Sequence, residues 1–77
     1  MHAEDTRTTV LKALKRVAPE SDPEGLDPDL PFRDQMNFDS VDFVNLMELL
    51  QQASGRRIPE TDYPCLGTLN GCIRYLG

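Results

Sequence analysis

Cysteine, histidine and tryptophan are scarce in this sequence, which has two cysteines, one histidine and no tryptophan. Cys65 and Cys72 form no Cys-x-x-Cys pair and His2 stands at the N-terminus, so no set of Cys/His metal ligands is present. A disulfide would require an oxidising compartment, which nothing in the chain indicates. Cys65 as a catalytic nucleophile would lack any partner base except His2. We therefore expect no metal, no catalytic residues and no enzymatic activity.

Long hydrophobic runs are also missing. Glu4 and Asp5 interrupt the N-terminus, and the apolar runs elsewhere fall far short of the roughly 20 residues that a membrane-spanning helix needs. We therefore expect no membrane span, no secretory segment and a cytoplasmic location. The 77 residues suffice for one domain, 1–77, with a small core and little room for a deep enzyme pocket. We expect this domain to be a monomer.

Basic residues are few, and their distribution is uneven. Residues 18–48 contain nine acidic side chains against Arg33 alone, whereas the rest of the chain has seven basic and four acidic side chains. A field this negative repels nucleic acid and favours basic protein surfaces, although an acidic run is also commonly a solvated loop. A helix-turn-helix DNA-binding domain is excluded because the best helix after residue 40 contains Asp42 and Glu48 and no basic residue.

Apolar residues recur at helical spacing, and no segment alternates with the period of a strand. The first helix is predicted from Asp5 or Thr6 to about Val17, with Val10 and Leu14 on its apolar face. Four prolines then predict a loop over residues 19–38. Apolar residues within this loop are expected to hold it against the helices: Leu26, Leu30, Phe32, Met36 and Phe38.

The second helix is predicted from residue 40 to about residue 53, with Gly55 as its C-terminal stop. A short third helix is expected to begin with Pro59 as its first residue and to end before Pro64. Thr68 is the expected N-cap of the last helix, in which Gly71 suggests close packing. The predicted fold is all-α: a small four-helix bundle with a long first loop and a short third helix.

The seam between the loop and the second helix has the residues of a helix cap. With Asp39 as N-cap, Asp42 falls at the third helical position, where both carboxylates can accept from free N–H groups of the first turn. Ser40 then falls at the first helical position, and its hydroxyl is not needed for capping. Because N–H groups and the helix dipole favour a phosphate at this end, Ser40 is suited to carry a phosphate ester.

Residues 36–46 resemble the attachment segment of acyl carrier proteins, in which Leu-Gly-x-Asp-Ser-Leu precedes an acidic residue and an apolar helix. The similarity extends to Ile58-Pro59 and to the last helix, and so covers nearly the whole chain in the family's order. The resemblance implies that Ser40 carries a phosphopantetheine arm whose thiol holds an acyl chain as a thioester. It also implies the partners: a phosphopantetheinyl transferase, and acyl-transfer or acyl-loading enzymes with basic surfaces in fatty acid, lipid or polyketide metabolism.

The second helix has two distinct faces. Its predicted core face consists of Phe43, Leu46, Met47 and Leu50. Val41 falls on the opposite side, and the family uses a leucine at the matching position as an apolar knob for partners. We therefore expect partners to bind this chain through Asp39, Val41, Asp42 and Glu48.

Three departures from the family pattern suggest a specialised carrier. Asn37 replaces a glycine and is expected to adopt positive φ. On the exposed side of the second helix, uncharged side chains replace the family's glutamates: Asn45, Gln51 and Gln52. Pro64 and Gly67 alter the third-helix region.

Two alternatives remain open from the sequence. The same attachment chemistry would serve an aminoacyl or peptidyl carrier, although the acidic balance favours an acyl carrier. A helical protein-interaction domain, in which Asp39 and Ser40 serve only as a helix start, would need no arm at all.

Overall fold

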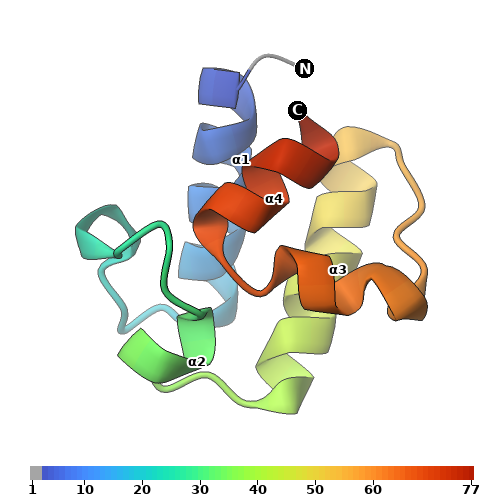
Figure 1. The fold of residues 1–77 in the computed structure, drawn as a ribbon. Coiled ribbons are helices and arrows are strands. Elements are labelled where there is room, and N and C mark those ends of the chain that lie inside the picture. The colour runs from blue at the N-terminus through green and yellow to red at the C-terminus, as the bar shows by residue number, and fades with distance from the viewer. Residues whose placement is uncertain (1–2) are drawn as a thin grey trace.

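Six helical segments make up most of the structure, a computed structural model that describes residues 3–77, with side chains from residue 4 (Figure 1). No strand occurs within these residues, so the all-α prediction is confirmed. His2 lies outside the described residues. In chain order the segments are α1 (Ala3–Val17), the 3-10 helix η1 (Pro23–Gly25), α2 (Phe32–Gln35), α3 (Ser40–Ser54), the 3-10 helix η2 (Glu60–Leu66) and α4 (Leu69–Leu76).

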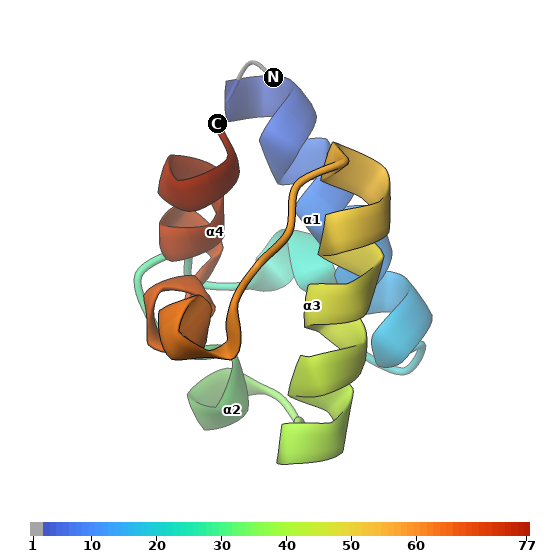
Figure 2. The same cartoon turned by 90° about the vertical axis from the view of Figure 1, so that its right-hand side faces the viewer.

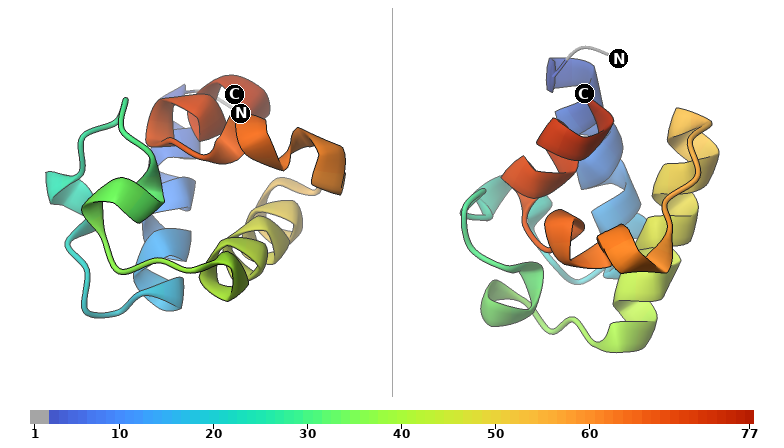
Figure 3. Two further views of the ribbon diagram at one scale, coloured as in Figure 1. Left: turned by 60° about the horizontal axis from the view of Figure 1, so that its bottom comes forward. Right: turned by 45° about the vertical axis from the view of Figure 1, so that its right-hand side comes forward.

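The three longest helices surround the core. Helices α1 and α3 run in opposite directions, and α1 contacts both α3 and α4 (Figures 1 and 2). The start of α1 and the end of α4 lie at one end of the molecule, whereas α2 and the start of α3 lie at the opposite end (Figure 3). The predicted acceptor, Ser40, is therefore at the end of the bundle distant from the chain termini.

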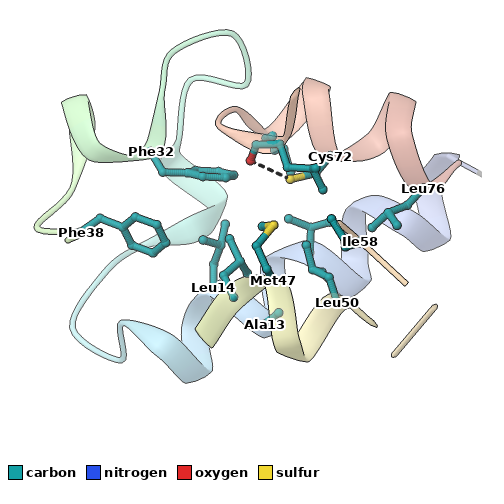
Figure 4. Close-up of a cluster of buried hydrophobic side chains, with 13 residues drawn as sticks. Ala13, Leu14, Phe32, Phe38, Met47, Leu50, Ile58, Cys72 and Leu76 are labelled. Carbon is teal, nitrogen blue, oxygen red and sulfur yellow. Dashed lines mark hydrogen bonds between the residues drawn. The ribbon is translucent and has the colours of Figure 1, made fainter. Parts of the chain in front are cut away.

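The core is formed by side chains from every α-helix, with contributions from the loops (Figure 4). On α3, Leu46, Met47 and Leu50 are fully buried as predicted, whereas Phe43 is only partly buried. Val10 and Leu14 of α1 are also fully buried, which confirms its predicted apolar face. Thr6 is buried in the same helix, although its polarity gave no such indication.

The predicted loop over residues 19–38 needs correction, because it contains η1 and the four-residue helix α2. Tertiary contacts determine α2: the Phe32 side chain is buried, and its N–H donates to the Gly67 carbonyl at 2.9 Å. A single turn is too short to show apolar periodicity in the sequence. Phe38 is buried, and Leu26 and Met36 pack against the core, but the prediction was wrong for Leu30, whose side chain is 47% exposed.

The third helix also differs from its prediction. Pro59 has an extended backbone and is the N-cap of η2 rather than its first helical residue. The helix continues through Pro64 to Leu66, because it has 3-10 rather than α geometry. Contact with α4 stabilises this segment: the Tyr75 hydroxyl donates to Asp62 Oδ2 at 2.6 Å, and this hydrogen bond raises the pKa of Tyr75.

The predicted C-terminal end of α3 and the predicted N-terminal end of α4 are both confirmed. Gly55 closes α3 in the left-handed conformation, with φ of 70°, and its N–H donates to the Gln51 carbonyl. Thr68 is the N-cap of α4, and its Oγ1 accepts from the Gly71 N–H at 2.9 Å. Each end is determined by chemistry within a few residues, which explains why both could be predicted.

Gly71 is required by close packing between α4 and η2. A Cβ atom at this position would collide with the Cys65 carbonyl oxygen and would lie 2.9 Å from Thr68 Oγ1. Gly71→Ala is therefore expected to lower the free energy of unfolding by about 1–3 kcal/mol, as overpacking generally does. Urea denaturation followed by circular dichroism measures this loss.

Gly67→Ala is the matched control. A Cβ atom at Gly67 would meet only the Pro64 carbonyl oxygen, at the ordinary distance of 3.7 Å. This substitution is expected to change stability by no more than about 0.5 kcal/mol. Equal losses at Gly67 and Gly71 would contradict the steric explanation.

Candidate functional site

The start of α3 is held by a reciprocal cap. Asp39 Oδ1 accepts from the Asp42 N–H at 2.8 Å, and Asp42 Oδ2 accepts from the Asp39 N–H at 3.3 Å. Each carboxylate thus satisfies a backbone donor at the other residue, as in a capping box. The predicted cap is confirmed, and it needs no contribution from Ser40.

Ser40 is the first residue of α3 and is exposed. The structure gives its hydroxyl no hydrogen bond within residues 3–77, so the oxygen is free to form an ester. The hydroxyl also stands at the positive end of a helix of 15 residues. Backbone N–H groups and the dipole favour a phosphate at such an end, so the site fits a phosphodiester on the Ser40 oxygen.

A pocket of about 480 Å³ opens beside Ser40, between α2, the start of α3 and η2. Its wall contains all three phenylalanines of the chain together with Tyr63. The rings form a continuous series, with centroid distances of 5.8 Å from Phe32 to Phe38, 6.3 Å from Phe38 to Phe43 and 5.6 Å from Phe43 to Tyr63. We refer to these four residues as the aromatic wall; Figure 4 shows Phe32 and Phe38 side by side at the edge of the core.

The polar residues of this pocket come from three elements. Ser40 and Asp39 line it at the start of α3, Arg33 comes from α2, and Thr68 precedes α4. Arg33 is exposed, and the structure gives its side chain no hydrogen bond within residues 3–77. The pocket thus has an apolar wall, and both Arg33 and Ser40 contribute to its lining. Sequence reasoning missed this pocket, because its residues are brought together only by the packing of α2 and η2.

The exposed face of α3 presents the residues predicted to meet partners. Val41 is 64% exposed, and Asp39 and Glu48 are exposed, whereas Asp42 is half-buried by its capping role. Sequence reasoning missed Val44, which is 42% exposed. Its position three residues after Val41 places it on the same helical face, a spacing that could have revealed it.

Two expectations about the departures from the family pattern were wrong. The side chain of Gln51 is half-buried, and its Oε1 accepts from the Ile58 N–H at 3.0 Å, so it supports the chain after α3. Asn45 and Gln52 are exposed as predicted. Asn37 does not adopt positive φ, because within residues 3–77 only Gly55 does so.

The cysteines differ in exposure. Cys72 is buried and donates from Sγ to the Leu66 carbonyl at 3.3 Å, as Figure 4 shows, and burial raises its pKa to about 12. The Cys72 thiol is therefore protonated and acts as a small core residue. Cys65 is exposed. Across residues 3–77, no group of three or more His, Cys, Asp and Glu side chains could hold a metal ion.

Comparison with known proteins shows what this chain is similar to. The family described as a phosphopantetheine attachment site matches residues 8–76. Acyl carrier protein 2 of Ralstonia nicotianae (strain ATCC BAA-1114 / GMI1000) is 28% identical over 71 residues, which cover 88% of each chain. No solved structure matches the chain. None of the helices in the described residues is long and apolar enough to cross a membrane.

Proposed function

The chain belongs to the family of phosphopantetheine-dependent carrier proteins, and on that premise we propose that Ser40 is the residue that carries the arm. The choice of Ser40 rests on the hydrogen bonding of the serine hydroxyls. Of the three serines in the chain, Ser21 donates to the Ala18 carbonyl at 2.7 Å and Ser54 donates to the Leu50 carbonyl at 2.6 Å. Ser40 alone has a hydroxyl that is exposed and makes no hydrogen bond within the described chain.

The prosthetic group of this family is phosphopantetheine, covalently attached, and the protein is a carrier rather than an enzyme. When attached, the arm supplies a thiol that holds its cargo as a thioester. The residues of this chain hold and present the attachment point. Asp39 and Asp42 keep the first turn of α3 in place, so that the Ser40 oxygen remains exposed to a modifying enzyme.

The cargo in this proposal is an acyl group, which the protein delivers to partner enzymes of fatty acid, lipid or polyketide metabolism in the cytoplasm. Similarity to an acyl carrier protein and the acidic balance of residues 18–48 support this choice. A phosphopantetheinyl transferase attaches the arm. The partners then bind the monomer through Asp39, Val41, Asp42 and Glu48, residues around the attachment point. The alternative cargo is an aminoacyl or peptidyl group, which would use the same attachment point.

Intact mass spectrometry of the protein co-expressed with a promiscuous transferase in its host tests this function. We expect a mass increase of one phosphopantetheine, together with a fraction of molecules that carry a further acyl mass. A further mass matching an amino acid would favour the alternative cargo. Absence of any arm would contradict the assignment of Ser40.

The exposed face of α3 has less negative charge than the family's pattern, and this difference predicts weak activity with general fatty acid synthesis enzymes. Asn45→Glu combined with Gln52→Glu restores two carboxylates on this face without disturbing Gln51, which supports Ile58. We expect the double variant to be loaded by a general acyltransferase about two- to tenfold faster at low salt, because exposed charge pairs steer association. The gain should shrink as salt rises, since salt screens such pairs.

The control places the same two charges elsewhere, with Thr8→Glu combined with Ala53→Glu. Both positions are exposed, Thr8 on α1 and Ala53 off the Val41 face of α3. Transfer rates are compared for the two double variants and the wild type across a salt series. If the control variant is loaded as fast as the test variant, the position of the charges does not determine partner choice.

A further inference from the structure

We propose that the pocket beside Ser40 is a resting site for the arm, in which Arg33 binds the phosphodiester and the aromatic wall contacts the neighbouring apolar part of the arm. This inference rests on the proposed attachment at Ser40. It assigns a binding role to Arg33 and to the aromatic wall, whose members come from α2, the loop before α3, α3 itself and η2.

The charges around Ser40 make this pocket a favourable site for the phosphodiester. The phosphodiester adds a negative charge next to the carboxylates of Asp39 and Asp42, and like charges at close range repel. Arg33 is the only basic residue among residues 18–48, and it lines the same pocket as Ser40. Its guanidinium makes no hydrogen bond in the described residues, so it is free to bind a phosphate oxygen. Arginine is well suited to this contact, because its planar fork presents several N–H donors.

A second pocket near the start of α3 provides a comparison. It has a volume of about 630 Å³ and lies between the end of α1, η1 and α2. Glu20, Asp22 and Asp42 contribute to its lining, and no lysine or arginine does. A phosphodiester would be repelled there. The two pockets thus differ in charge, and the one that Arg33 lines is the favourable site.

The aromatic wall suits the portion of the arm that follows the phosphate. In phosphopantetheine this portion carries two methyl groups on one carbon, which is the most apolar part of the arm. Phe43 and Tyr63 are only partly buried, so their rings leave apolar surface open in the pocket. Covering that surface removes apolar area from water and is favourable. The volume of about 480 Å³ falls within the roughly 300–1,000 Å³ of small-molecule sites.

The wall also limits how far the arm can enter. Behind it, Leu46, Met47 and Leu50 are fully buried and occupy the centre of the bundle. The arm therefore rests at the surface, where a partner enzyme can withdraw it.

Proton NMR of the modified protein, with the arm labelled in its two methyl groups, tests the inference. Methyl groups that lie over aromatic rings shift upfield, so we expect the two methyl signals to lie upfield of those in free pantetheine. Arg33→Gln is expected to lower the ratio of docked to free arm by about two- to fivefold, the effect of an exposed ion pair. Added salt should reduce the upfield shift in the wild type more than in Arg33→Gln.

Two further variants separate charge from structure. Arg33→Lys keeps the positive charge and should retain most of the upfield shift. Arg57→Gln removes an exposed arginine beyond the far end of α3, whose 15 residues span on the order of 20 Å, and should leave the shift unchanged. Far-ultraviolet circular dichroism confirms that each variant is folded.

The outcomes distinguish this inference from the proposed function. A modified wild-type protein whose methyl signals match those of free pantetheine would overturn the resting site alone. Equal effects of Arg33→Gln and Arg57→Gln on the methyl shift would also overturn the resting site and leave the attachment intact. A protein that gains no arm, as judged by intact mass, would overturn the attachment at Ser40 and with it the resting site.

Discussion

Replacing Ser40 with alanine is expected to abolish the mass increase of one phosphopantetheine. The substitution removes the oxygen to which the arm would be bonded, so the loss should be complete rather than partial. Helical structure should be nearly unchanged, because Asp39 and Asp42 cap α3 and Ser40 contributes no hydrogen bond to the cap. Intact mass after incubation with a transferase and coenzyme A measures the first effect, and far-ultraviolet circular dichroism measures the second.

Ser54→Ala is the control for this experiment. The Ser54 hydroxyl donates to the Leu50 carbonyl at the end of α3 and is already engaged in the fold. The Ser54→Ala protein should gain the arm as the wild type does. An arm that persists on Ser40→Ala, or that moves to Ser54, would show that the attachment residue has been assigned wrongly.

Leu46→Ala is expected to lower the free energy of unfolding by about 2–5 kcal/mol, the range for a buried leucine. Leu46 is fully buried at the middle of α3, in the core shared with α1. Because small domains have total stabilities of only about 5–15 kcal/mol, this loss should bring the protein close to unfolding. Urea denaturation followed by circular dichroism gives the change in midpoint and in free energy.

Val41→Ala is the matched substitution on the opposite face of the same helix. Val41 is 64% exposed, so its truncation should cost no more than about 0.5 kcal/mol. Modification or acyl loading should nevertheless slow, since Val41 adjoins Ser40 on the surface offered to partners. A stability loss as large as that of Leu46→Ala would mean that Val41 contributes to the core.

Helix ends and the candidate attachment residue were open to prediction because their chemistry is local. Asp39 and Asp42 are three residues apart, and their reciprocal hydrogen bonds depend only on the geometry of the first turn. Gly55 and Thr68 likewise form contacts within a few residues of themselves. The burial of Leu46 follows from the 3.6-residue period of the α-helix.

Side chains with distant partners could not be predicted in this way. Gln51 is a polar residue of the kind expected on the exposed side of a helix, yet its side-chain oxygen accepts a hydrogen bond from the Ile58 N–H. Leu30 is apolar but remains exposed. The residue before it connects the loop to α4, because the Asn70 side chain donates to Asp29 Oδ1 at 2.6 Å. No periodic pattern in the sequence describes such pairs, since each depends on how two segments meet.

The three longest helices, the capped start of α3 and the free hydroxyl of Ser40 could all be predicted, because hydrogen bonds within one turn and a regular apolar period depend on residues that are close in the sequence. The helical turn of α2 depends on tertiary packing, and so does the pocket in which the aromatic wall and Arg33 lie beside Ser40. These residues come from segments as far apart as Phe32 and Tyr63, and their positions depend on the packing of α2 and η2 against the core.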